Sequence, residues 1–517
     1  MAAAWGSHDA HGPIELTPFR HKDALAPHGQ AEEGLHGAAS LDLRDYGLGG
    51  PPPARRPPRS AWEFLQHQGG WLLATAHIVT AIIGAGVLGL PYALSWLGAR
   101  AAAPPPRPAR ADVRGRGRGR PRAPRRAAAR AGWAGGVVVL LLFYVITLVS
   151  SLLLTECHET GGVKHETYRA AVKHVLGPRH AAVLSLFQYL NLVLSSIGYT
   201  VAAGQSLRIL VGEVCSRSRF EACYDQTWVM SLVFGACQLL LSQLPSLEAA
   251  WWSSIVGAVM SFAYSTCALG LGAAQAHRRQ GDLLGRPAPP LEKALNVFNA
   301  LGSIAFAYNF TGVLMEIQAT LHEPPRAAVN MRRAVHAGMG ASLAFYIAVS
   351  ATGYAALGNA VPGDILTAYD RPAGVVTAAN AMVLLHMLPA YQVFSQPVFH
   401  GLEAAFTDHA PRRCAALPPR ALRLAGRSAY VALTTGVAVV MPFFTDIIGL
   451  VGALVFWPAA VFYPVKLYSA VYRPGRRARA AMAAMNAAAA VTSVLAVVGA
   501  SWNIRQHVGA FTLGWRT

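Results

Sequence analysis

Long apolar runs, separated by short polar segments, follow one another along most of the chain. An apolar run of about 20 residues with few charges is typical of a transmembrane helix, because it matches the thickness of a bilayer's hydrocarbon core. Backbone hydrogen bonds in lipid must also be made within the segment, which favours helices. The pattern predicts an all-α polytopic membrane protein with about eleven transmembrane helices. The runs lie near 72–97, 133–155, 181–211, 228–244, 249–274, 295–320, 335–357, 373–401, 428–444, 446–468 and 480–502.

The first run, HIVTAIIGAGVLGLPYALSWLG, carries helix breakers in its middle: Gly84, Gly86, Gly89 and Pro91. The G-x-G-x-x-G spacing also occurs in dinucleotide-binding folds, which need a strand before the glycines and an acidic residue about 20 positions later. No βαβ pattern surrounds these glycines, and the next acidic residue is Asp112. We therefore interpret the breakers as an unwound segment that lines a polar cavity, with close helix packing as the alternative.

The sixth run, LGSIAFAYNFTGVLMEIQATL, has a matching interruption, because Gly302 and Gly312 bracket a polar group around Asn309. Transporters built from inverted repeats place broken helices at corresponding positions in their two halves, and the substrate binds there at mid-membrane. The first and sixth runs are five apart. The pattern thus predicts a five-plus-five inverted repeat with broken helices 1 and 6.

The composition supports an integral membrane protein that is embedded in the lipid bilayer. The chain is 53% hydrophobic and 13% charged, whereas soluble domains are about 25% charged. The six cysteines contain no C-x-x-C motif, and the runs contain no spacing typical of a catalytic triad or a metal cluster. We expect neither an enzyme nor a metal or other cofactor.

Basic residues indicate the orientation of the chain. The tail 1–70 and the loops after the sixth, eighth and tenth runs are rich in arginine, whereas the loop after the seventh has one arginine and the loop after the ninth has none. Positively charged loops stay in the cytoplasm. The prediction is a disordered cytoplasmic N-terminal tail at 1–70, a transporter domain at 71–502 and a short extracellular C-terminal tail at 503–517.

The tract 99–132 departs from this rule, because it holds eleven arginines in 34 residues on the predicted outer side. One interpretation is a basic arm for nucleic acid. We prefer an unstructured low-complexity insertion, and suspect a gene-model artefact, because its removal would leave a short turn between the first two runs. We expect no nucleic-acid partner.

Two cysteines, Cys215 and Cys223, share the predicted outer loop after the third run. Oxidising conditions there permit a disulfide bond. We predict this bond, with two free thiols as the alternative.

Several segments together resemble the plant-type amino acid permeases of the amino acid/auxin permease family. The resemblance covers about 77–468 without the arginine-rich tract, and its first segment is similar to lysine/histidine-type permeases. It implies a LeuT-like fold of eleven helices and proton-coupled symport of amino acids, mostly at the plasma membrane. The segments are HIVTAIIGAGVLGLPYALSWLG, QYLNLVLSSIGYTVAAG, WWSSIVGAVMSFAYS, IAFAYNFTGVLMEIQATL, GYAALGNAVPGDILT, AYQVFSQPVF and GLVGALVFWPAAVFYPV.

The two predicted breaks suggest how an amino acid would bind. Its carboxylate should meet N–H groups where the first helix unwinds, because a helix N-terminus favours anions. Its ammonium group should meet backbone carbonyls at both breaks, and polar side chains should line the rest of the pocket. The expected carboxylate site is Gly84, Ala85, Gly86 and Val87; the expected ammonium site is Ile82, Phe306, Ala307 and Tyr308; the expected side-chain pocket includes Asn191, Tyr308 and Asn309.

Proton coupling requires a titratable group within the membrane, where charged residues are rare and costly. His77 and His386 lie in the first and eighth runs, the family resemblance places histidines in both motifs, and histidine titrates near physiological pH. For each, the alternative is a neutral histidine that donates to a carbonyl. Glu316 either relays the proton or pairs with a basic residue at the membrane edge. Protons are the expected coupling ion, with sodium as the alternative.

These observations predict a secondary active transporter in the plasma membrane that imports amino acids, with broad or neutral selectivity. Two alternatives stay open. An amino acid sensor would bind its ligand without net uptake, and an auxin influx carrier would share the same architecture.

Overall fold

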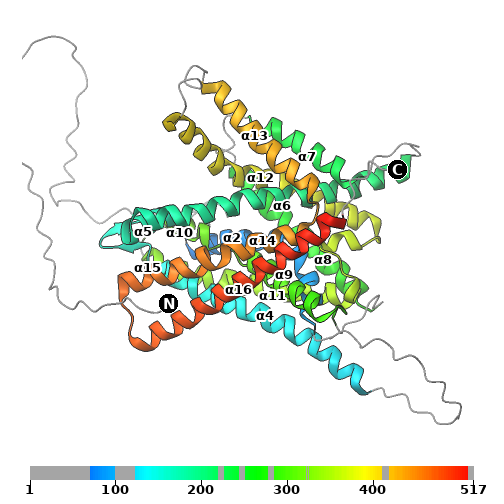
Figure 1. Ribbon diagram of the computed structural model, residues 1–517, viewed down its shortest axis with the longest axis horizontal. Coiled ribbons are helices and arrows are strands. Elements are labelled where there is room, and N and C mark those ends of the chain that lie inside the picture. The colour runs from blue at the N-terminus through cyan, green and yellow to red at the C-terminus, as the bar shows by residue number, and fades with distance from the viewer. Residues whose placement is uncertain are drawn as a thin grey trace, which may run out of the picture. The chain divides into compact units, whose positions relative to one another are not determined.

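The computed structural model describes residues 70–98, 123–218, 226–243, 251–277, 285–321, 323, 325–409 and 419–510. The regular secondary structure of this part of the chain is helical apart from one short hairpin (Figure 1). The hairpin strands β1 (Glu159–Thr160) and β2 (Val163–Lys164) are antiparallel, with Glu159 opposite Lys164. The predicted tail 1–70, apart from its last residue, lies outside the described residues.

Each predicted apolar run is mainly helical over the residues that the structure describes. The first run is the pair α2 and α3, the sixth is α9 and α10, and the tenth is α14 and α15, which a π-helical segment joins. The elements are α2 (Trp71–Ile82), α3 (Gly86–Leu97), α4 (Ala123–Glu156), α5 (Tyr168–Leu176), α6 (Pro178–Ser218), α7 (Thr227–Leu241), α8 (Trp251–Gln275), α9 (Pro290–Ala307), η3 (Thr311–Val313), α10 (Leu314–Ala319), α11 (Ala327–Leu357), η4 (Gly358–Ala360), η5 (Ile365–Ala368), α12 (Ala373–His409), α13 (Pro419–Val440), α14 (Phe444–Val455), η6 (Phe456–Phe462), α15 (Tyr463–Tyr472) and α16 (Arg476–Ala510).

A polytopic helical architecture is confirmed. In the part of the chain that the structure describes, eight helices are long and apolar enough to cross a membrane, and the bent pair α2 and α3 makes a ninth. The runs at 228–244 and 428–444 form α7 and α13, which do not meet the same measure of length and hydropathy. The count of eleven spans stays a prediction.

Two predicted segment boundaries fall inside helices. The last ten residues of the arginine-rich tract are the first residues of α4, so the expectation of an unstructured tract is wrong for 123–132, while 99–122 lies outside the described residues. At the other end, α16 continues to Ala510. The expected C-terminal tail therefore begins as helix.

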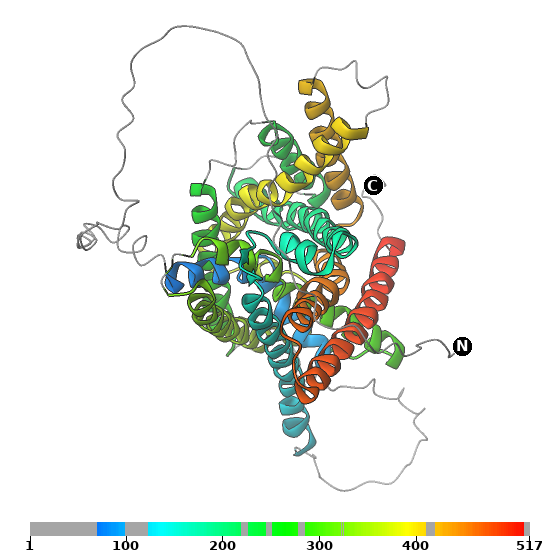
Figure 2. The ribbon, with the colours of Figure 1, turned by 90° about the vertical axis from the view of Figure 1, so that its left-hand side faces the viewer.

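The interior is built around α9 and α6. Helix α9 packs against α3, α14 and α16, and α6 packs against α7, α12 and α14. Figure 1 shows α6 and α14 running side by side across the middle of the view, and both views show α12 and α13 lying together at one side of the bundle (Figure 2).

Glycines allow α9, α14 and α16 to approach one another closely. A Cβ atom on Gly302 of α9 would overlap the carbonyl oxygen of Gly449 in α14, and one on Gly499 of α16 would lie 2.6 Å from the Asn299 nitrogen. Small residues at helix contacts are how membrane helices gain packing energy, since lipid supplies no hydrophobic drive for their association. The three helices therefore form one tightly packed group.

A buried carboxyl group lies in the connection between α11 and α12. Asp364 is 3% exposed, and its Oδ1 atom accepts a hydrogen bond of 2.9 Å from the Leu366 N–H at the start of η5. Its Oδ2 atom is buried and has no hydrogen-bond partner among the described residues. Burial raises the pKa of Asp364 from an ordinary 3.8 to about 6, because a carboxylate loses its hydration there.

We expect Gly302→Ala to lower the free energy of unfolding by about 1–3 kcal/mol, because the added methyl group forces α9 and α14 apart. Gly436→Ala in α13 is the matched control, since no atom lies within 4 Å of the position of its Cβ. Thermal unfolding of the detergent-purified variants measures both. Equal midpoints for the two variants would contradict the close packing.

Asp364→Asn should stabilise the protein at pH 7.5 by up to about 3 kcal/mol, since each pKa unit corresponds to about 1.4 kcal/mol. The folded state binds the proton more tightly than the unfolded state, so stability is full below about pH 4 and falls as the pH rises toward 6. The gain from the substitution should therefore vanish near pH 4. Unfolding midpoints across this range test it, with the exposed Asp370→Asn as the control. A gain that does not depend on pH would contradict this assignment.

Candidate functional site

The first predicted interruption separates α2 from α3, which meet at an angle of 56°. Between them, the Gly84 N–H donates to the Ile82 carbonyl at 2.9 Å, and the Val87 N–H donates to the Gly84 carbonyl at 3.2 Å. The N–H groups of Ala85 and Gly86 donate no hydrogen bond within the described chain. Two backbone donors therefore remain at the N-terminus of α3, where the helix dipole favours an anion.

The second interruption lies between α9 and α10. Regular helix ends at Ala307, the Asn309 N–H donates to the Phe306 carbonyl at 3.0 Å, and the Phe310 N–H donates to the Tyr308 carbonyl at 3.0 Å. The short 3-10 turn η3 then leads into α10. The polar residues around Asn309 are thus part of an irregular segment.

The two interruptions lie against each other. A Cβ atom on Gly86 would lie 3.0 Å from Cα and 3.2 Å from Cβ of Ala307, so glycine permits the contact. No atom lies within 4 Å of the corresponding position on Gly84. The contact at Gly86 joins the two breaks, and the described residues leave open space beside the Cβ position of Gly84.

Tyr346 of α11 bridges the ends of the two half-helices. Its hydroxyl oxygen lies 2.6 Å from the Ile82 carbonyl and 2.8 Å from the Ala307 carbonyl, and the side chain is fully buried. A hydroxyl has a single hydrogen and can donate to one of the two carbonyls at a time. These carbonyls belong to the predicted ammonium site, but Tyr346 was not predicted, because nothing in the seventh run marks it.

The predicted side-chain pocket is brought together in part. The Asn309 amide donates to the Asn191 Oδ1 atom of α6 at 2.9 Å. The Tyr308 ring packs against Tyr346 with ring centres 5.3 Å apart, and Val87 is buried in α3. Asn191 and Asn309 therefore connect α6 to the irregular segment.

Several buried hydroxyl groups around the second interruption have no hydrogen-bond partner in the described part of the chain. They belong to Tyr308, Thr311 of η3, and Ser195, which lies one turn beyond Asn191 on the same face of α6. Buried polar groups in proteins are nearly always paired. Unpaired hydroxyls near the second interruption are suited to hydrogen bonds with a polar ligand.

The predicted proton-coupling residues have different surroundings. His77 lies on an exposed part of α2. His386 of α12 is buried, and its Nδ1 atom donates to the Gly257 carbonyl of α8 at 2.8 Å, the contact expected of a neutral histidine. The buried Oε2 atom of Glu316 has no hydrogen bond, and no ion pair of this residue is found in the described ranges.

A charged pair that the sequence analysis missed lies at the start of α14. The Asp446 side chain is 1% exposed, accepts a 2.9 Å hydrogen bond from the Asn299 amide of α9 and forms an ion pair with His507 of α16. An acidic residue inside an apolar run is itself a signal of function or of a structural partner. That signal was available in the sequence and points to this network.

The outer-loop cysteines are only partly described. Cys215 is disulfide-bonded, whereas Cys223 lies outside the described residues. Their pairing stays a prediction.

Comparisons with known proteins give a consistent result. The family described as "Transmembrane amino acid transporter protein" matches residues 126–506, well over half of the chain. Amino acid permease 2 of Arabidopsis thaliana is 35% identical over 432 residues, which cover 78% of this chain and 81% of the relative. Amino acid permease 4 of the same plant is 34% identical over 78% of this chain and 85% of its own. Lysine histidine transporter-like 6, also from this plant, is 31% identical over 78% and 84%.

Tyr346→Phe should lower the free energy of unfolding by about 1–3 kcal/mol, because it leaves the buried Ala307 carbonyl without a donor among the described residues, whereas the Ile82 carbonyl still accepts from the Gly84 N–H. The matched control is Tyr308→Phe, which removes a hydroxyl that has no partner in the described structure and should change stability little. Thermal unfolding of both purified variants checks the difference. Equal losses would contradict the bridging role of Tyr346.

Proposed function

This chain belongs to the transmembrane amino acid transporter family, and from that premise we propose that it imports amino acids across the plasma membrane by proton symport. The observation that carries the proposal is the contact between two interrupted helices at Gly86 and Ala307. Unpaired N–H groups and buried carbonyls converge there. An amino acid zwitterion has a carboxylate that N–H groups can bind and an ammonium group that carbonyls can bind.

We place this activity in eleven spans with a LeuT-like five-plus-five inverted repeat and a cytoplasmic N-terminus. In a five-plus-five repeat, each span of the first half corresponds to the span five positions later. A contact between spans three and ten, which are α6 and α14, should therefore be matched by a contact between spans eight and five, which are α12 and α8. Both contacts are present. Contacts of α8 with α11 and of α15 with α4 form a second exchanged pair. The helices that would correspond between the two halves also touch, as α3 with α9, α4 with α11, α6 with α12 and α7 with α13.

In the proposed complex, the substrate carboxylate accepts hydrogen bonds from the free N–H groups of Ala85 and Gly86. The ammonium group approaches the carbonyls of Ile82 and Ala307, where the Tyr346 hydroxyl shifts its hydrogen to whichever carbonyl the ligand leaves unpaired. The remaining predicted groups line the space around the substrate. They are Gly84, Val87, Asn191, Phe306, Tyr308 and Asn309.

The proton would bind at His386, His77 or Glu316. His386 is buried, and its Nδ1 hydrogen bond orients the ring so that Nε2 is the nitrogen that gains a proton. The unpaired Oε2 atom of Glu316 supports a relay role over a structural ion pair. His77 has the weakest support, because its side chain is exposed and does not face the interior of the bundle.

Cells that express the full chain should show an inward current when a neutral amino acid is added in sodium-free medium. The current should be several-fold larger at about pH 5.5 than at about pH 7.5, because the coupling site is more often protonated in acid. Current that requires sodium would contradict proton symport. A protein that reaches the surface but carries no current with any of a panel of amino acids would contradict import and favour a sensor or an auxin carrier.

The same recording tests His386. His386→Gln removes the titratable ring, so the ratio of the currents at the two pH values should fall toward one. His336→Gln replaces an exposed histidine in the third turn of α11; it is the matched control and should keep the ratio of the unsubstituted protein. A normal ratio in His386→Gln would assign the proton site to another residue.

A further inference from the structure

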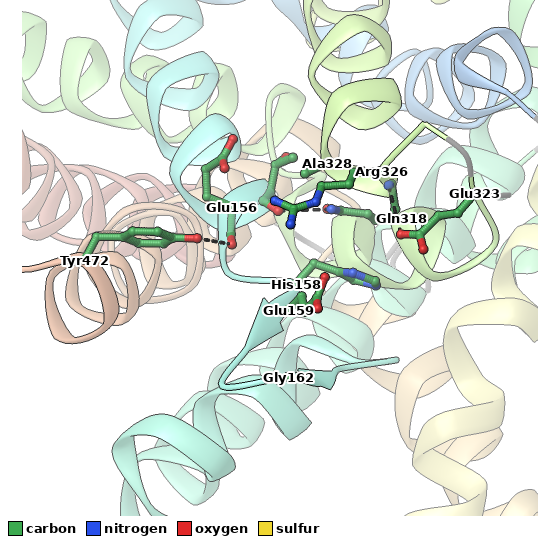
Figure 3. Close-up of a pocket in the computed structure, with 11 residues that line it drawn as sticks. Glu156, His158, Glu159, Gly162, Gln318, Glu323, Arg326, Ala328 and Tyr472 are labelled. Atoms are coloured by element: carbon green, nitrogen blue, oxygen red, sulfur yellow. Dashed lines mark hydrogen bonds between the residues drawn. The ribbon is translucent and has the colours of Figure 1, made fainter.

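A cavity of about 240 Å³ lies away from the helix breaks, where four segments meet. These are the end of α4, the β1–β2 hairpin, the connection from α10 to α11 and the end of α15 (Figure 3). Pockets for drug-sized ligands are about 300–1,000 Å³, so this cavity suits a smaller molecule. In the proposed orientation it opens to the cytoplasm.

Two ion pairs connect the walls of the cavity. Lys164 Nζ on the hairpin lies 2.7 Å from Glu323 Oε2, and Arg332 Nη1 of α11 lies 3.1 Å from Glu156 Oε1 at the end of α4. Both pairs join the proposed first half of the transporter to the second. Exposed ion pairs of this kind each contribute little energy, so the walls can separate.

One charge of each sign is left over on the cavity wall. Glu159 of β1 and Arg326 at the start of α11 both line the cavity, and neither forms an ion pair within the ranges that the structure describes. Ala327 and Ala328, in the first turn of the 31-residue α11, also line it. The first N–H of this helix, on Ala327, already donates to Glu323 Oε1 at 3.2 Å, so the positive charge available to an anionic group is that of Arg326.

A buried imidazole completes the cavity. His158 is 6% exposed, and its Nε2 atom is buried without a hydrogen-bond partner in the described chain. Burial lowers the pKa of His158, and the Lys164 charge lowers it further, against the opposing charges of Glu323 and Glu159. The ring is therefore neutral near pH 7, and a neutral imidazole nitrogen can accept a hydrogen bond from an ammonium group.

We propose that this cavity is a second binding site for a zwitterionic α-amino acid, with the carboxylate at Arg326 and the ammonium group at Glu159 and His158. The hairpin and α11 would then be joined by the ligand as well as by the ion pairs. Amino acid that accumulates in the cytoplasm would hold these walls together and slow further import. This inference rests on the proposed function and orientation.

Inside-out patches from cells that express the full chain test the inhibition directly. Alanine in the pipette drives the current, and alanine is then added to the cytoplasmic face. The current of each variant with cytoplasmic alanine is divided by its own current without it. Back-transport through the main site affects all variants alike, so differences between these ratios report on the second site. Loss of a charge-assisted hydrogen bond in Glu159→Gln or Arg326→Gln should raise the half-inhibiting concentration by about tenfold or more.

Two neighbouring charges serve as matched controls. Glu166→Gln follows the hairpin, and Arg333→Gln is adjacent in sequence to the paired Arg332; both residues are exposed and neither lines the cavity. These variants should be inhibited like the unsubstituted protein. Equal inhibition of all four variants would overturn the second site.

Equilibrium binding to the purified full-length protein separates this inference from the proposed function. Radiolabelled alanine should bind at two sites per chain, and Glu159→Gln should retain one of them. One site in the unsubstituted protein would overturn the inference even where the current confirms import. Two sites without current would overturn import and leave the second site supported.

Discussion

Backbone hydrogen bonds cannot be left unpaired in lipid, and the arrangement of this bundle depends on that constraint. Interrupting α2–α3 and α9–α10 frees the N–H groups of Ala85 and Gly86 and the carbonyl of Ala307, while the Ile82 carbonyl accepts from the Gly84 N–H and lies within reach of the Tyr346 hydroxyl. The two interruptions can persist only where they face each other and not lipid. Tyr346 supplies a hydrogen to the carbonyls, whereas the N–H groups have no such partner in the described chain, and this asymmetry is what makes the breaks suited to an anion.

Uninterrupted helices hold this irregular region in place. Glycine contacts bring α14 and α16 close to the backbone of α9, and buried polar groups fix their register. Asn299 donates to Asp446, which also pairs with His507, and Asn503 donates to Asn296 at 3.0 Å. Each network joins α9 to a neighbouring helix about two to three turns before its end at Ala307. The irregular segment therefore follows a helix whose middle is held by polar contacts.

The short helix α10 connects the breaks to the cavity beside the hairpin. It is six residues long, begins directly after η3 and carries Gln318, which lines the cavity and donates to the Thr155 carbonyl of α4 at 3.0 Å. Glu316, with its unpaired buried oxygen, lies two residues earlier on α10. A change in the walls of the cavity can thus reach the irregular segment through a single helical element.

The sequence by itself determined the helical membrane architecture, the place of both interruptions and the family, because apolar run length, glycine and proline spacing and multi-segment motifs are local properties of the chain. It also brought Asn191 and Asn309 into one predicted pocket. Only the tertiary structure decided that Tyr346 bridges the two half-helices, that Asp446 pairs with His507, and that His158, Glu159 and Arg326 share a cavity. Such contacts join residues far apart in the chain, and their chemistry depends on which helix faces meet, which no local pattern records.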